Sequence, residues 1–119
     1  METHIEELYN EGMQNDSLGQ RENAIKCFQD VMAVADKTSN YYRSSRHNLA
    51  CQLVATGKYD DGIKLFEESA ADNHPASLYY LGVHYERRND CRAIGCYIKS
   101  ANLGNADAIT ALKDLGINF

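Results

Sequence analysis

The stretch that decides the fold runs from residue 75 to residue 104 and reads PASLYYLGVHYERRNDCRAIGCYIKSANLG. An α-helix turns by about 100° per residue, so apolar or small residues that recur every three or four positions share one face. Two sets share a face in this way, one on each side of a polar break: Leu78, Leu81, Gly82 and Tyr85, then Ala93, Tyr97, Ser100 and Ala101. Two amphipathic helices joined by the short turn Asn89-Asp90 form an αα-hairpin. Gly82 and Ala93 are small enough to let the two backbones approach closely.

The same periodicity continues through the rest of the chain. It predicts further helices over about residues 5–15, 20–36, 41–55, 59–71 and 106–115. Paired in order, they give hairpins over about 5–36, 41–72 and 75–103 and a capping helix over about 106–115. Thr3 and Glu6 have the spacing of a capping box, which makes Thr3 the expected N-cap of the first helix. No strand-like alternation persists beyond a few residues, so the sequence predicts an all-α fold.

Composition limits the classes of protein to consider. With 119 residues, 44% of them hydrophobic and 24% charged, the chain has the make-up of a soluble globular protein. We expect one domain spanning residues 1–119. A net charge of −5, with eight acids against three bases in residues 1–38, argues against nucleic acid or a membrane surface as the partner. No apolar run approaches the roughly 18 residues of a membrane helix, and no leader pattern is present, so we expect a cytoplasmic protein.

Self-comparison shows an internal repeat in the second helix of each hairpin. Three sets of residues align: Ala24, Phe28 and Val31; Gly62, Phe66 and Ser69; and Ala93, Tyr97 and Ser100. Upstream of them, three small residues occupy matching positions: Gly12, Ala50 and Gly82. A hairpin cannot bury its apolar stripe alone, so stacked neighbours are expected to share a core.

Two segments carry a resemblance to known repeat families. The segment GKYDDGIKLF, residues 57–66, resembles the turn and second helix of a tetratricopeptide repeat. Residues 75–104, followed by residues 105–108, look like a Sel1-like repeat. The resemblance implies an αα-hairpin solenoid of about three repeats plus a capping helix, coiled into a right-handed superhelix whose first helices line a concave surface. Glu11, Asn15 and Arg46 depart from the pattern, which marks the first hairpin as a degenerate, capping repeat.

The resemblance places a peptide-binding groove on the first helix of each hairpin. The candidate groove residues are Tyr9, Asn10, Met13, His47, Asn48, Cys51, Tyr79, Tyr80 and Val83. Aromatic rings with Asn between them suit a bound protein segment, because Asn can bond a backbone while the rings bury side chains. We therefore expect a non-catalytic adaptor that binds a protein or peptide and needs no cofactor. The alternative is that superhelical curvature buries these residues between adjacent first helices. Basic residues needed to clamp a C-terminal carboxylate are missing, with Ala76 and Tyr80 in their places.

Other chemistries have weaker signals. Cys91, Cys96 and the nearby His84 are residue types that bind zinc. The two cysteines are five positions apart, however, so on a helix their thiols would point about 140° apart. We expect no metal site. Cys51 lies one turn from His47, the spacing of a thiol or hydrolytic enzyme pair, although no third orienting group is identifiable. A further alternative is a structural protein that forms a homodimer through the ends of the solenoid.

Overall fold

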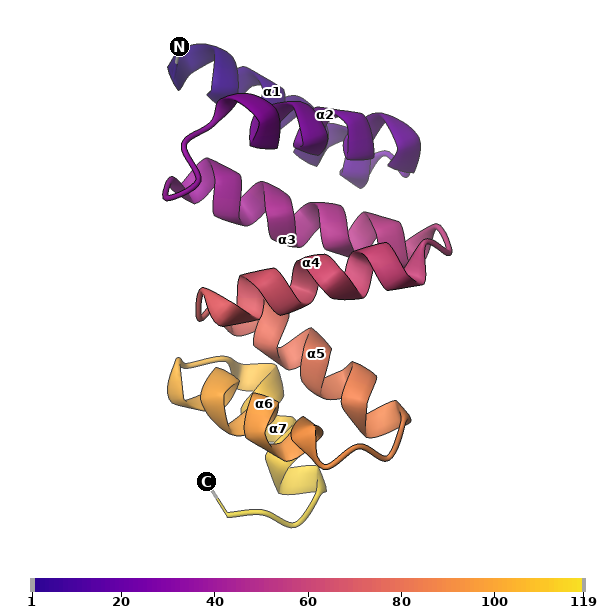
Figure 1. Ribbon diagram of the computed structural model, residues 1–119, viewed down its shortest axis with the longest axis vertical. Helices are drawn as coiled ribbons and strands as arrows, with labels where there is room; N and C mark the ends of the chain where they lie inside the picture. The colour runs from indigo at the N-terminus through magenta and orange to yellow at the C-terminus, as the bar shows by residue number, and fades with distance from the viewer. Residues whose placement is uncertain (1, 119) are drawn as a thin grey trace. The chain divides into compact units, whose positions relative to one another are not determined.

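The computed structural model describes residues 2–118, and their side chains from Thr3 onward. Consecutive α-helices account for nearly all of this range, and it contains no β-strand (Figure 1). The helices are α1 (Glu2–Ser17), α2 (Arg21–Val34), α3 (Asn40–Ala55), α4 (Tyr59–Ala71), α5 (Pro75–Arg87), α6 (Arg92–Asn102) and α7 (Ala106–Asp114). The predicted all-α fold is confirmed.

Polar side chains cap three of these helices at their first turn. Ser39 Oγ accepts a hydrogen bond from the backbone N–H of Tyr42 (3.2 Å), and Asn105 Oδ1 accepts one from Ala108 (2.9 Å). His74 fills the same position before α5, where its Nδ1 accepts from the backbone N–H of Ser77 (3.3 Å). These acceptors satisfy N–H groups that have no partner within the helix. The prediction for Thr3 is wrong: α1 begins at Glu2, so Thr3 lies inside the helix and is not its N-cap.

The chain divides into two compact units, one up to Leu65 and one from Phe66 onward. The boundary falls within α4, whose first half belongs to unit 1 and whose second half belongs to unit 2. A single domain over residues 1–119 and a right-handed superhelix stay predictions.

In unit 1, α2 packs against both α1 and α3. Its core consists of Ala24, Phe28, Leu49 and Leu53, with Tyr9, Ile25, Met32 and Leu65 packed against them. A β-carbon placed on Gly12 would lie 2.8 Å from Cε1 of Phe28, so the glycine lets the Phe28 ring rest directly on the α1 backbone.

In unit 2, α6 packs against both α5 and α7. Tyr97 is 1% exposed and lies against Gly82, where an added β-carbon would come within 2.5 Å of its ring. The sequence predicted that Gly82 and Ala93 let two backbones approach closely; the group found against Gly82 is the Tyr97 ring. Gly82 and Tyr97 thus repeat in unit 2 the contact of Gly12 and Phe28 in unit 1, at positions that the internal repeat aligns.

Candidate functional site

Three of the predicted groove residues meet in unit 1, on α1 and α3. The side-chain amide of Asn48 donates to Tyr9 Oη at 3.5 Å and to Met13 Sδ at 3.3 Å. The Tyr9 ring also stands edge-on to the Tyr41 ring, with centroids 5.6 Å apart. Among the described residues the amide oxygen of Asn48 accepts no hydrogen bond, so it is available to an N–H donor from outside. Met13 is exposed, and Asn10 is exposed one turn from it on the same helix.

The predicted pair of His47 and Cys51 is also present on α3. Cys51 Sγ lies 3.6 Å from His47 Nε2. Burial, and then the nearby charge of Asp16, raise the pKa of the Cys51 thiol to about 11. A nucleophilic cysteine needs a lowered pKa, because the thiolate is the reactive form. At neutral pH Cys51 is therefore held as a thiol, which is the opposite of activation.

In unit 2, the predicted α5 residues have different positions. Tyr79 and Val83 line a cleft of about 320 Å³ between α5, α6 and α7. Tyr80 is not among its lining residues: its ring stacks on Phe66, with centroids 5.4 Å apart and planes 19° apart, while 45% of the residue stays exposed. One face of Tyr80 therefore packs on α4, a second helix and not one of the adjacent first helices of the packing alternative, and the rest of the residue meets solvent.

The cleft contains polar groups that the sequence interpretation missed. Its other lining residues are Glu86, Arg87, Tyr97, Ala111, Asp114 and Leu115. Tyr97 Oη donates to Glu86 Oε1 at 2.7 Å, and burial together with this bond raises the pKa of Tyr97. The lining therefore mixes apolar and aromatic side chains with three charged ones, Glu86, Arg87 and Asp114. For the lining residues Ala111, Asp114 and Leu115, the sequence offered only the periodicity that predicted the capping helix.

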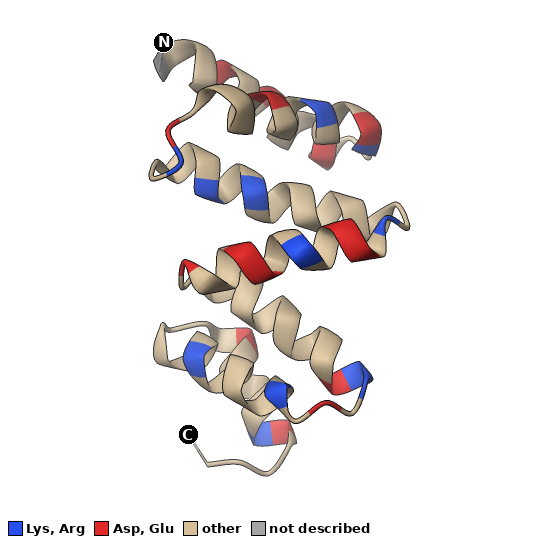
Figure 2. Ribbon diagram, viewed as in Figure 1, with Lys and Arg blue, Asp and Glu red and all other residues tan. Residues whose placement is uncertain are grey.

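Charge differs along the chain, as Figure 2 shows: acidic residues, in red, recur on α1, α2 and α4. All four cysteines are free thiols in the structure. In the described part of the chain, no three His, Cys, Asp or Glu side chains gather in a way that could hold a metal ion. The described helices also include none with the length and apolar character of a membrane span.

The fold defines a class of protein: an all-α protein of αα-hairpins with the tetratricopeptide type of helical repeat. A crystal structure of PcrH from Pseudomonas aeruginosa is similar to this chain, with a TM-score of 0.74. The sequences are 17% identical, and the match covers 98% of this chain and 89% of PcrH. A scan of protein-family models finds no match. A search of curated proteins also finds none. The finer resemblance to Sel1-like repeats stays a prediction.

Proposed function

We propose that this chain is a non-catalytic protein-interaction module that binds a peptide or partner segment. The binding faces are the first helices: Tyr9, Asn10, Met13, His47, Asn48 and Cys51 on α1 and α3, and Tyr79, Tyr80 and Val83 on α5. PcrH, which has a similar fold, is a tetratricopeptide-fold chaperone, and this supports a protein as the ligand. A cytoplasmic location stays a prediction.

The cleft of unit 2 is the observation that carries this proposal. It lies beside Tyr79 and Val83, on the helix that the repeat pattern assigns to the binding face. A volume of about 320 Å³ accommodates a large side chain, with Arg87 and Asp114 at hand for polar groups of a bound backbone. The unit 1 cluster adds the Asn48 amide oxygen as an acceptor beside exposed Met13.

The test begins with a peptide selected from a random phage-display library on the wild-type protein. Its affinity is then measured by calorimetry for Asn48→Ala, Val83→Lys and Arg87→Glu, with thermal melting in parallel. Leu103→Lys is the control, because Leu103 is 48% exposed on the surface and lines neither the cleft nor the Asn48 cluster. We expect the control to bind normally and at least one site variant to lose about 1–3 kcal/mol, or roughly 5- to 150-fold.

If the peptide binds all three site variants as tightly as it binds the wild-type protein and the control, the binding site lies elsewhere and the proposal is overturned. Arg87→Glu is the variant expected to fold normally, because Arg87 is an exposed residue in the last turn of α5. A loss of affinity in this variant can therefore be assigned to the site. A loss of affinity that follows a fall in melting temperature in every variant would likewise count against a groove and for a purely structural role.

A further inference from the structure

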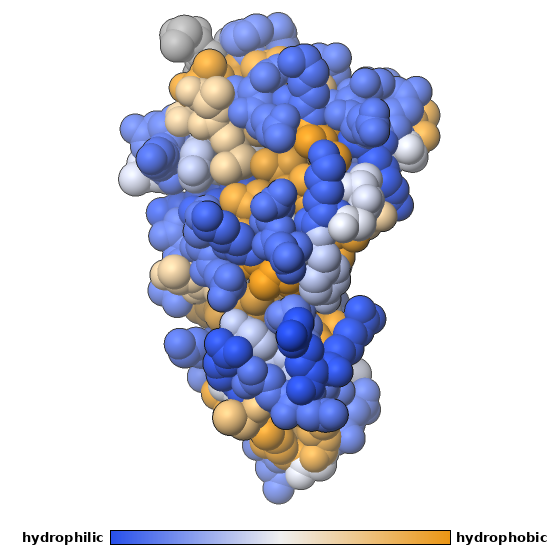
Figure 3. Space-filling view, turned by 45° about the vertical axis from the view of Figure 1, so that its right-hand side comes forward, coloured by the Kyte–Doolittle hydropathy of each residue, from blue (hydrophilic) through white to orange (hydrophobic). Residues whose placement is uncertain are grey.

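Unit 2 has a second and larger hollow, on the opposite side of α5 from the cleft. It measures about 470 Å³ and lies between α4, α5 and α6. Its floor is made by Leu78, Leu81 and Tyr85, which belong to the stripe of α5 that faces away from Tyr79 and Val83. We call this hollow the α4–α6 groove. On the face drawn in Figure 3, apolar surface shows between hydrophilic side chains of the C-terminal helices.

The groove exists because its walls carry small side chains. Ala70 and Ala71 form the α4 wall, and Gly95 and Cys96 form part of the α6 wall. A β-carbon built on Gly95 would have no atom within 4 Å, so the space above it is open. Larger side chains at these positions would fill the space above the floor residues. The small residues leave an apolar slot that extends along α6.

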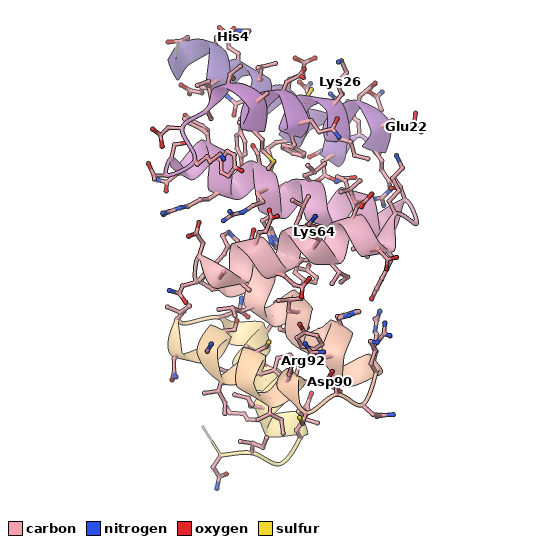
Figure 4. The ribbon with its side chains drawn as sticks, in the orientation of Figure 1. His4, Glu22, Lys26, Lys64, Asp90 and Arg92 are labelled. Carbon is pink, nitrogen blue, oxygen red and sulfur yellow. The ribbon has the colours of Figure 1, made fainter. Side chains whose placement is uncertain are left out.

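Two cations on the α6 side flank this slot. Arg92 and Lys99 are seven residues apart, which is two helical turns or about 10 Å. Asp90 holds the Arg92 guanidinium through Nε and Nη2 (2.7 Å to Nη2), and the guanidinium lies over the Tyr85 ring at 4.2 Å. Figure 4 shows Arg92 and Asp90 side by side at the beginning of α6. Among the described residues Arg92 Nη1 has no hydrogen-bond partner, so a pre-oriented donor remains for a carboxylate.

We propose that the α4–α6 groove binds an acidic amphipathic helix of a partner protein. Its apolar residues at positions i, i+3, i+4 and i+7 lie on the floor, and two carboxylates seven positions apart face Arg92 and Lys99. Helices dock into apolar grooves in this way, anchored by residues at these spacings. An extended strand is disfavoured, because the described helices offer no sheet edge for it to join. Two acids lie near these cations, because Asp90 pairs with Arg92 and Glu67 stands on the α4 wall. Among the described residues, Lys99 is therefore the groove cation that no carboxylate pairs, and the flank toward α6 is the one that favours negative charge.

The proposal is tested on the intact protein with two labelled 15-residue peptides and fluorescence anisotropy. Both carry the same leucine stripe in an alanine and glutamine background; one has Glu at two flanking positions seven apart, and the other has Lys there. The chain carries a net charge of −5, so non-specific attraction favours the Lys peptide, and tighter binding of the Glu peptide is diagnostic. We expect the Glu peptide to bind about fivefold or more tightly than the Lys peptide.

Two variants locate the binding. Gly95→Leu fills the slot and is expected to weaken the Glu peptide about tenfold, whereas Asn102→Leu adds the same side chain to α6 outside the groove and serves as the control. Lys99→Glu is expected to reverse the preference between the two peptides. The cleft variant Val83→Lys leaves Glu-peptide binding unchanged, which separates this site from the proposed function.

Three outcomes would overturn the proposal. One is equal binding of both peptides with no effect of Lys99→Glu. Another is Glu-peptide binding that Gly95→Leu leaves intact. The last is self-association in light scattering that Gly95→Leu abolishes, because the occupant would then be a second copy of this chain.

Discussion

The glycine at position 82 gives the sharpest test of the packing. In Gly82→Ala the new methyl group would lie 2.5 Å from Cε1 and 2.6 Å from Cδ1 of Tyr97. Carbon atoms in favourable contact are about 3.5–4.0 Å apart, so the ring would have to move by about 1 Å. It has little room to do so, because Tyr97 is 1% exposed and its hydroxyl is bonded to Glu86.

The net effect follows from two opposing terms. Overpacking of this kind costs about 1–3 kcal/mol, while alanine is favoured over glycine inside a helix by about 1 kcal/mol. We expect the overpacking to prevail and Gly82→Ala to lose up to about 2 kcal/mol of unfolding free energy, which lowers Tm by up to roughly 10 °C. The matched control is Gly95→Ala on α6, where no atom lies within 4 Å of the added carbon. That variant should gain about 0.5–1 kcal/mol.

Urea denaturation and thermal melting of both variants, followed by circular dichroism, measure the difference. Replacing the ring in Gly82→Ala/Tyr97→Leu should remove most of the interaction between the two sites in a double-mutant cycle. A Gly82→Ala protein as stable as Gly95→Ala would refute the reasoning, because it would show that the Tyr97 ring does not rest on the α5 backbone.

Three further predictions concern single groups. His74→Ala removes the side-chain N-cap of α5 and should lower the unfolding free energy by about 1 kcal/mol in urea denaturation at pH 7; an unchanged midpoint would show that the cap contributes nothing. Tyr97→Phe removes the hydrogen bond to Glu86 and should lower the unfolding free energy by about 1–2 kcal/mol; no change would show that solvent replaces the bond without loss. The Cys51 thiol has a pKa of about 11 in the folded protein, against 9.0 for an ordinary thiol. Below pH 9 the thiol is therefore protonated in both the folded and the unfolded protein, whereas from pH 9 to 11 it stays protonated only in the folded protein. The unfolding free energy should therefore fall from pH 9 to pH 11 by roughly 2–3 kcal/mol more in wild type than in Cys51→Ala. Iodoacetamide at pH 8 should label the exposed Cys91 well before Cys51, and mass spectrometry measures the order of labelling.

Local sequence signals predicted the helices well. Helix α4 runs from Tyr59 to Ala71 as predicted, and Ser39 and Asn105 act as caps where polar residues precede a periodic segment. Thr3 fails because a capping box is only a local preference, and Glu2 before it already belongs to the helix. Signals of this kind depend on neighbours in sequence, which is why they could be read without the tertiary structure.

The repeat aligned residues that make contacts between helices, although it did not predict the contacts themselves. The register that aligned Phe28 with Tyr97 also aligned Gly12 with Gly82, and these residues do meet in pairs. Of the residues that line the cleft, the sequence singled out Tyr79 and Val83 on α5 as groove candidates, and nothing in the pattern of α7 indicates that Leu115 lines the same cleft. The stacking of Tyr80 on a neighbouring ring was likewise beyond a helical wheel, which says where a side chain points but not what it meets.

The pairing of a glycine with an aromatic ring has a consequence for how the chain folds. Gly12 meets Phe28 and Gly82 meets Tyr97 across only 16 and 15 positions of sequence. Closing such short loops costs little entropy, and proteins rich in local contacts fold in microseconds to milliseconds. The contact between glycine and ring can therefore form in each of these hairpins as soon as its second helix has left the ribosome, before the stacked neighbours arrive to cover the rest of the apolar stripe.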